Sequence, residues 1–272
     1  MEIEAQCFTD TVAGMLMHSL GASVHSATRI SHYGRCGHAR AAVRVLDETS
    51  DWLVACKPYG ASVHEGADSL LQQLSADGHA PPLLPVHRID ATTTGVVLFA
   101  KGGATAALLQ EALNAETTSK QYTAVLMGEL HGAGCWSQPL TRRAEGRKNP
   151  QGSPRSARAP ASTGYRVLET ATDARLSLVE LSLRVAGRTH QIRRHAALAR
   201  HAVIGDRRYG EARHCSLIER MFGFDRVALH ASRLSIRIDG VDYLYEAPLP
   251  AAWGTLLEPL GWQGRLHGSS GL

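Results

Sequence analysis

The sequence predicts a globular protein that mixes helices with strands. Residues 96–100 and 122–128 are rich in β-branched and aromatic side chains, which is typical of strands with a buried face. Residues 103–116 repeat their apolar side chains at helical spacing. The 272 residues are enough for one large or two small domains with a substantial core.

The overall composition is that of an ordinary soluble protein, with 44% hydrophobic and 20% charged residues. No run approaches the ~20 apolar residues of a membrane span, and the acidic N-terminus lacks the features of a signal peptide. We therefore expect a cytoplasmic protein that does not engage a membrane. Five scattered cysteines without a C-x-x-C pair argue against a disulfide framework and against a structural zinc site.

Arginine dominates the positive charge of the chain. There are 25 arginines but four lysines, and the net charge is +4. The planar guanidinium suits bidentate contacts with phosphates and stacking on bases, which favours a nucleic-acid partner. A codon bias toward arginine would give the same excess, so composition alone does not decide between the two.

Residues 1–45 show no clear pattern, and we expect a compact extension packed on a main domain that spans residues 46–272. A strand is expected at residues 51–56, and Lys57–Gly60 ends it in a turn. Asp68 is expected to cap a short helix that follows this turn.

The stretch Pro81–Lys101 is the most informative part of the chain. Its three prolines exclude a helix and favour an extended approach. A loop then carries His87, Arg88 and Asp90 before the buried strand begins. A carboxylate on a loop held between prolines and a core strand is well placed to act as a catalytic acid. On this stretch alone, an Asx turn between Asp90 and the threonines that follow it is the simpler interpretation.

The carboxy-terminal half predicts further strands and a helix with a mixed surface. Residues 165–169 and 176–183 are expected to form paired strands. A helix is expected to begin near Thr189, with Ile192 on its apolar face. Arg193 lies on a neighbouring face, so it can project toward a site while the helix packs behind it.

Residues 141–160 form a segment rich in glycine, proline, serine and charge. Six cations against one glutamate give it a net charge of +5, so nearly all of the excess positive charge of the chain lies here. Two interpretations stay open. The segment is either a solvated insertion or an arm that closes over a phosphate backbone.

Four motifs in order along the chain resemble those of the RluA family of RNA pseudouridine synthases. Residues 87–95, HRIDATTTG, are similar to that family's H-R-L-D-x-x-T-S-G, and residues 187–195 match G-R-x-H-Q-I-R-x-H at every fixed position. Residues 120–122 match K-x-Y, and residues 56–64 resemble N-K-P-x-G-x-x-V-H with cysteine in place of asparagine.

The resemblance extends from about residue 46 to residue 253. Residues 201–210 resemble G-H-P-I-x-G-D-x-x-Y-G, with Ala202 in place of proline. The sequence of Leu229–Ser235, LHASRLS, is most similar to the TruC-like branch of the family, which modifies transfer RNA. Many relatives carry an RNA-binding S4 domain before the catalytic domain, and its pattern is not visible in residues 1–45.

The resemblance implies a fold and a domain plan. The fold would be α+β, the pseudouridine synthase fold, with a mixed and mainly antiparallel sheet, flanking helices and a central RNA-binding cleft. Residues 46–272 would form the catalytic domain, and residues 141–160 would be a basic insertion within it.

The resemblance also implies roles for individual residues. Asp90 would act at the sugar–base junction of uridine, and Arg193 would hold its carboxylate ionised through a charge-assisted pair. Tyr122 would stack on the extruded base near the C5 proton. Arg88 would fill the gap that the base leaves in the RNA. Residues expected to contact RNA come from the motifs and from the basic insertion: Lys57, His87, Arg88, Arg188, His190, Gln191, Arg142, Arg143, Arg147 and Lys148.

The implied reaction breaks the N1–C1′ bond of uridine, rotates the base and rejoins it through C5. Nothing is oxidised and no group is lost, so we expect neither a metal nor a cofactor. The expected partner is transfer RNA or ribosomal RNA, bound by a monomer. Two other interpretations differ in class. One is a non-catalytic RNA-binding or RNA-folding factor, which would not need Asp90. The other is a metal-dependent hydrolase built on His87 and Asp90, which lacks further ligands at suitable spacing.

Overall fold

The computed structural model describes residues 43–79, 82–142, 144, 149–183 and 187–262. Its strands are β1 (Arg44–Glu48), β2 (Trp52–Lys57), β3 (Leu84–Pro85), β4 (Thr94–Ala100), β5 (Ser119–Met127), β6 (Ala133–Trp136), β7 (Leu140–Thr141), β8 (Arg158–Ala159), β9 (Thr163–Ala171), β10 (Leu176–Leu183), β11 (Leu229–Ile238) and β12 (Val241–Glu246). Its helices are α2 (Leu70–Ala76), α3 (Gly103–Asn114), α4 (Gln191–Leu198), α5 (Ala212–Phe222), η1 (Ala251–Trp253) and α6 (Gly254–Leu257).

Ten of these strands form one sheet in the order β1-β2-β4-β11-β5-β10-β9-β6, with β12 beside β11 and β3 beside β4. Among the described strands only the pair β4–β11 runs parallel, and the other pairs are antiparallel. The short strands β7 and β8 pair separately at the base of the basic insertion. The fold is therefore α+β with a mixed, mainly antiparallel sheet, as predicted.

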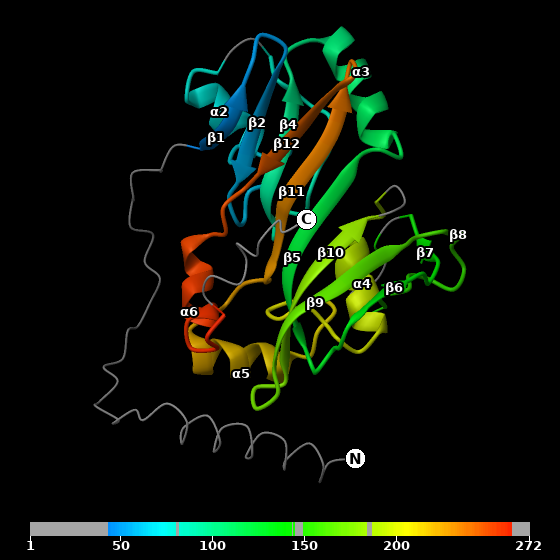
Figure 1. Ribbon diagram of the computed structural model, residues 1–272, viewed down its shortest axis with the longest axis vertical. Coiled ribbons are helices and arrows are strands. Elements are labelled where there is room, and N and C mark those ends of the chain that lie inside the picture. The colour runs from blue at the N-terminus through cyan, green and yellow to red at the C-terminus, as the bar shows by residue number, and fades with distance from the viewer. Residues whose placement is uncertain (1–42, 80–81, 143, 145–148, 184–186, 263–272) are drawn as a thin grey trace.

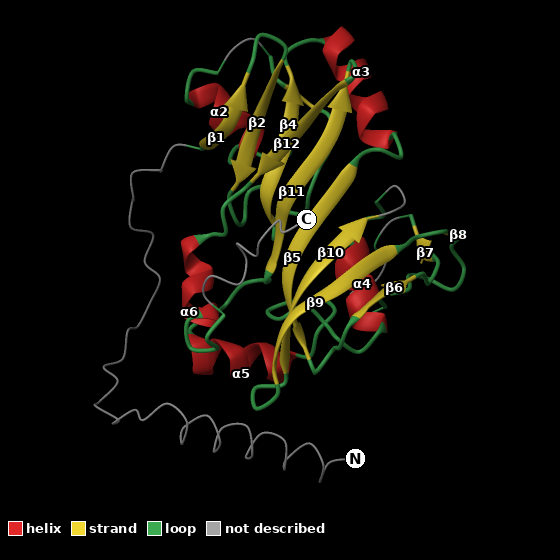
Figure 2. Ribbon diagram, in the orientation of Figure 1, coloured by secondary structure: helices red, strands yellow, loops and turns green. Residues whose placement is uncertain are grey.

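The sheet has two halves that meet at its central strands, β5 and β11 (Figures 1 and 2). We call β1 to β4 and β12, with α2 and α3, the first half, and β6, β9 and β10, with α4, α5 and α6, the second half. In Figure 1, α2 and α3 lie at the upper end of the molecule, and α4, α5 and α6 lie in its lower half. The chain crosses from the first half to the second through β5.

The first half is buried on both faces of its inner strands. One cluster joins Val54 and Leu98 to Leu109 on α3. Another joins Val97 and Phe99 to α2 on the opposite face. Every residue of β4 is buried as a result. A strand covered on both sides needs apolar residues at every position rather than at alternate ones, which explains the continuous apolar run seen in the sequence.

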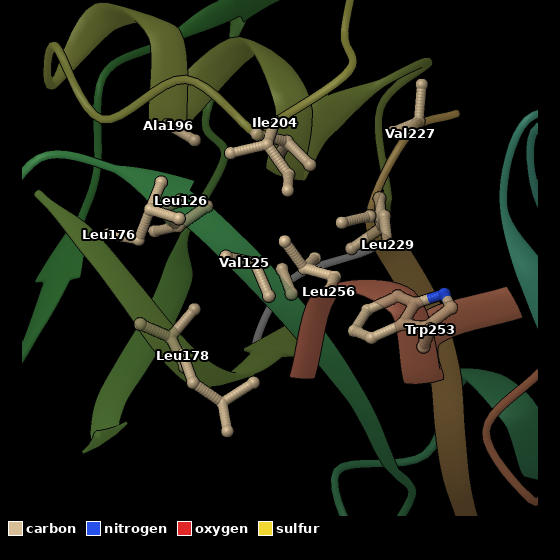
Figure 3. Packing of buried hydrophobic residues seen from close by; sticks show 14 of the residues in the cluster. Val125, Leu126, Leu176, Leu178, Ala196, Ile204, Val227, Leu229, Trp253 and Leu256 are labelled. Atoms are coloured by element: carbon tan, nitrogen blue, oxygen red, sulfur yellow. The ribbon is translucent and has the colours of Figure 1, made fainter. Parts of the chain in front are cut away.

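The second half has its own core (Figure 3). Val125 and Leu126 of β5 and Leu178 of β10 pack there against helix residues that include Ala196 of α4 and Trp253 of η1. A core of this kind fixes the helix α4 against the sheet. It therefore also fixes the polar side chains that α4 presents on its other faces.

The expected elements are present with ends shifted by a few residues, and three of these differences bear on the site or its surroundings. The cap of α2 is Ser69, whose Oγ accepts a hydrogen bond from the Gln72 N–H at 3.3 Å, so the expected cap Asp68 was wrong by one residue. The helix α4 begins after His190 instead of near Thr189. The sheet begins at Arg44, two residues before the expected domain start. Residues 1–42 lie outside the described part of the chain. None of the described helices is both long and apolar enough to cross a membrane.

Candidate active site

Asp90 lies on the loop between β3 and β4, and its carboxylate is turned toward the second half. The turn after it is closed by the backbone, because the Thr93 N–H donates to the Asp90 carbonyl at 2.9 Å. The carboxylate instead accepts a hydrogen bond from Arg193 Nη1 at 3.2 Å. The Asp90 side chain keeps 23% of its surface exposed. The Asp90 side chain therefore does not form the Asx turn. It joins the two halves of the fold and is still partly exposed to solvent.

Lys57 supports this loop from behind. It is fully buried, and its Nζ donates to the carbonyls of Pro58, Ala61 and Ala91 at 2.8, 2.7 and 3.1 Å. Burial lowers the pKa of Lys57 to about 8, while the nearby charge of Asp90 acts in the opposite direction. Lys57 was predicted to contact RNA. In the structure it instead ties the turn at Pro58–Ala61 to Ala91, the residue that follows Asp90.

His87 supports the same loop from its amino-terminal side. Its Nε2 accepts a hydrogen bond from the Leu98 N–H of β4 at 3.0 Å, so this nitrogen is unprotonated. Burial, with a smaller contribution from the charge of Lys120, lowers the pKa of His87 to about 3. His87, also predicted to contact RNA, is therefore a neutral brace between the loop and the core strand.

Gly95 explains why the threonines of this motif are followed by glycine. Its φ is 118°, and a Cβ there would lie 2.1 Å from the carbonyl oxygen of Ala231. Gly95 and Ala231 are partners in the parallel pairing of β4 with β11. Only glycine allows this close approach, which places the Asp90 loop at the junction of the two halves.

Arg193 reaches the site from α4 and is held on two sides. Its Nε and Nη2 donate to Asp206 at 2.7 and 2.8 Å, and its Nη1 donates to Asp90. Arg193 is 5% exposed and Asp206 is 1% exposed. Burial alone would lower the pKa of Arg193, but the hydrogen bonds and charge of Asp206, together with Asp90, raise it above its ordinary value. The guanidinium is therefore a fixed cation behind the Asp90 carboxylate.

Asp206 belongs to this cluster, although the sequence analysis did not single it out. Besides Arg193, its carboxylate accepts the backbone N–H groups of Arg208 and Tyr209 at 3.0 and 3.2 Å. It occupies the aspartate position of the G-D-x-x-Y-G pattern noted in the sequence. The signal was present, but nothing in the pattern indicated which side chain this aspartate would bind.

His190 and Tyr209 lie beside the Asp90–Arg193 ion pair and contact each other. His190 Nδ1 and the Tyr209 hydroxyl are 2.9 Å apart, and His190 Nε2 lies 3.8 Å from the Asp90 carboxylate. Burial lowers the pKa of His190, although the charge of Asp90 opposes this shift. His190 is a non-glycine residue with a φ of 55°. This left-handed conformation lets the helix α4 begin immediately beyond the site.

Tyr122 on β5 lies where the cores of the two halves meet. It packs against the apolar clusters of both the first and the second half. Burial, followed by the charge of Asp90, raises its pKa well above the ordinary value. The phenol is therefore protonated at neutral pH and close enough to Asp90 for that charge to act on it.

The remaining residues predicted to contact RNA differ in their exposure. Arg88 is 66% exposed beside Glu65, at a separation of 3.5 Å. Arg188 donates to the Pro160 carbonyl at 3.3 Å. Gln191 is buried, where it accepts from the Arg188 N–H and donates to the Ser162 carbonyl. Arg142 is exposed. The other three predicted contacts lie outside the described residues: Arg143, Arg147 and Lys148.

Within the described part of the chain, no three histidine, cysteine, aspartate or glutamate residues are grouped so that they could hold a metal ion. The partner of Asp90 is a guanidinium instead. The arrangement offers a carboxylate that is fixed from behind, open in front and flanked by an aromatic ring.

Comparison with known proteins agrees with this geometry. Residues 51–198 match the family model described as RNA pseudouridylate synthase. The chain is 33% identical to ribosomal large subunit pseudouridine synthase D of Yersinia pestis, over 79% of this chain and 70% of that protein. It is 31% identical to tRNA pseudouridine synthase C of Pectobacterium carotovorum, over 77% and 60% of the two chains.

Solved structures show the same likeness. The structure of human RNA pseudouridylate synthase domain containing 1 superposes with a TM-score of 0.64 at 27% identity, over 76% of this chain and 84% of that one. The structure of human RNA pseudouridylate synthase domain containing 4 gives a TM-score of 0.65 at 24% identity, over 80% of this chain and 93% of that one. This likeness supports the fold. The chain belongs to the RNA pseudouridylate synthase family, as its RluA-like motifs predicted.

Proposed function

We propose that this chain isomerises a specific uridine in ribosomal or transfer RNA and that Asp90 is the carboxylate that acts at the sugar–base junction. One observation carries the assignment. Asp90 is partly exposed, whereas the arginine that fixes it is buried and is itself anchored by Asp206. A catalytic group has to meet its substrate, and its supports have to be locked by their own partners.

Arg193 positions the carboxylate without reaching the substrate. Because two of its nitrogens are bound to Asp206, the third can point only along the direction that meets Asp90. The uridine would thus meet a carboxylate with a set orientation, and no reorganisation of the guanidinium would be needed during the reaction.

Tyr122 would provide the surface on which the extruded base stacks. Its ring is held by both cores, and its raised pKa keeps the hydroxyl protonated. Such a side chain can stack on a base and donate a hydrogen bond. Arg88, exposed two residues before Asp90, would occupy the space that the flipped base leaves in the RNA.

The residues predicted to contact RNA divide into two groups. We assign phosphate or base contact to the exposed ones, which include Arg88 and Arg142. Lys57, His87 and Gln191 instead position the loop and the helix, because each is engaged with backbone groups. We further expect a monomer that acts in the cytoplasm.

The target RNA can be identified by mapping pseudouridines in total RNA from cells with and without this protein. One ribosomal or transfer-RNA position should lose its pseudouridine, and expression of the wild-type chain should restore it. If every pseudouridine persists while the purified protein still binds RNA, the chain is a non-catalytic RNA-binding factor. A conversion that a chelator abolishes would favour the metal-dependent alternative.

A further inference from the structure

Two arginines beside the catalytic ion pair hold the basic insertion. Arg194 directly follows Arg193 on α4, and Arg208 comes two residues after Asp206. Both direct their guanidinium groups to residues of the insertion, which are 43 to 64 positions away in the chain. An arginine thus stands one or two positions after each partner of the buried Arg193–Asp206 pair, and both arginines donate hydrogen bonds to the insertion.

Arg194 is fully buried and binds both arms of the insertion. On the first arm, its Nη1 donates to the Thr141 carbonyl and its Nη2 donates to Thr141 Oγ1, each at 2.9 Å. On the returning arm, its Nε donates to the Pro150 carbonyl at 2.5 Å and its Nη2 to the Gln151 carbonyl at 3.1 Å. One guanidinium therefore joins the two arms of the insertion to the helix.

Arg208 makes a second attachment farther along the insertion. Its Nη2 donates to the Ala144 carbonyl at 2.8 Å. Its guanidinium also lies over the Tyr209 ring, 5.4 Å from the centroid. Tyr209 in turn contacts His190 beside Asp90. The insertion is therefore connected to the site by a short chain of contacts from Arg208, and by the position of Arg194 next to Arg193 on α4.

The insertion presents exposed cations on backbone segments near these anchors. Arg142 is exposed and follows the anchored Thr141, while Arg155 and Arg158 are exposed on the returning arm. Fixed cations bind a polyanion better than mobile ones, because the ordering cost is not incurred again on binding. Position 194 is also one that the family motif leaves open, so the motif itself does not account for an arginine there.

We propose that Arg194 is a positioning residue that fixes the basic insertion to the catalytic helix, so that RNA phosphates held by Arg142, Arg155 and Arg158 are placed in register with Asp90. This inference rests on the proposed function, because it takes RNA as the substrate. Arg194 acts only through the insertion and touches no substrate. The opposite expectation, a freely solvated insertion, was one of the two interpretations left open by the sequence.

The attachment itself can be tested without RNA. Arg194→Lys keeps the charge but replaces five forked donors with a single ammonium, which cannot span both arms. Thr141→Val removes one acceptor and leaves Arg194 in place, in case the first variant folds poorly. Trypsin should cleave after Arg155 and Arg158 at least about tenfold faster in Arg194→Lys, because the insertion opens more often. Wild-type cleavage rates in both variants would overturn the proposal.

The effect on RNA is tested with a double-mutant cycle. The first change in the cycle is Arg194→Lys, and the second replaces Arg142, Arg155 and Arg158 with glutamine. Binding to an unmodified transfer-RNA transcript is measured as a function of salt. Neutralising three phosphate contacts should flatten the slope of log K against log salt by about 2 to 3 units. Arg194→Lys should flatten it by about 1 to 2 units although no charge is lost.

The combination separates a positioning role from other roles. Arg194→Lys alone should raise the KM for RNA while kcat stays within a few-fold. In the triple-glutamine background, the same change should have no further effect on the salt slope or on KM. If the effects of the two changes add, Arg194 does not act through the insertion and the proposal fails. If the triple variant alone leaves the slope unchanged, the proposed RNA contact of the insertion fails, whereas the trypsin result still decides the attachment.

Discussion

The Asp90 loop and the helix α4 meet at one site but are held in place by different interactions. The loop is held through its backbone: His87 accepts a backbone N–H, and the buried ammonium of Lys57 donates to three backbone carbonyls. Besides its apolar face, the helix is held by three consecutive polar side chains that are all buried. Arg193, Arg194 and His195 are all 5% exposed or less.

In the proposed mechanism, this difference separates chemistry from support. On the loop, the carboxylate proposed to act is partly exposed, and its neighbours His87 and Lys57 fix the backbone. On the helix, the functional side chain is part of the core, together with Asp206. Changes on the helix side should therefore cost global stability, whereas changes on the loop side should cost chemistry or pH tolerance.

Arg193→Ala should have the largest effect on stability. It leaves the buried carboxylate of Asp206 without its partner, and removing one member of a buried pair costs about 3–5 kcal/mol. Conversion of uridine should also be lost, because Asp90 loses its support. Denaturant unfolding and tritium release from labelled RNA measure the two effects.

The matched control for that variant is Arg166→Ala, which breaks an exposed pair with Glu180 on the sheet. Exposed pairs contribute at most about 1 kcal/mol. If Arg193→Ala is no less stable than this control, α4 does not depend on buried charge, and the contrast between loop and helix is wrong.

His87→Gln should produce a smaller effect that depends on pH. The pKa of His87 is about 3 in the folded chain and 6.5 in the unfolded one. Below pH 6.5 only the unfolded chain gains a proton, so the wild type loses stability as pH falls, by about 1.4 kcal/mol per unit. Glutamine accepts the same N–H without titrating. Its stability relative to wild type should improve by about 2 kcal/mol from pH 6.5 to pH 5.

The same variant also decides whether His87 touches RNA. His64→Gln, at a ring that is 39% exposed, controls for the substitution itself. A brace predicts unchanged RNA affinity in His87→Gln. Weaker RNA binding with unchanged pH dependence would return His87 to the RNA-contacting group predicted from the sequence.

Tyr122 allows the smallest change, the removal of one hydroxyl. Tyr122→Phe should keep RNA affinity, because the ring still stacks, and should lose turnover if the hydroxyl assists removal of the C5 proton. Tyr122→Leu should weaken RNA binding as well, since base stacking contributes about 1–3 kcal/mol. Full turnover in Tyr122→Phe would limit the residue to stacking.

The first half of the fold was predictable because its signals are local. The prolines, the glycine and the continuous apolar run of β4 lie within 20 residues of Asp90 and describe the loop almost completely. Even the error there was local, since Ser69 and the neighbouring Asp68 are both suitable caps.

The helix side was predictable only in part, because its partners are distant in the chain. The spacing of Ile192 placed the apolar face correctly, but Arg194 and His195 are buried as well. They bind Thr141, Gln138 and Thr163, which lie 32 to 57 residues away. Helical periodicity reports the packing of one face. It cannot show that a remote insertion covers the others.

Asp90→Asn tests the central claim most directly. The amide can still accept from Arg193, which stays bound to Asp206, so the fold and the RNA dissociation constant should change little. Tritium release from C5-labelled RNA should fall at least about 100-fold, since the variant lacks the carboxylate. Turnover within a few-fold of wild type, in a variant that folds and binds RNA normally, would contradict the assignment of Asp90 as the catalytic residue.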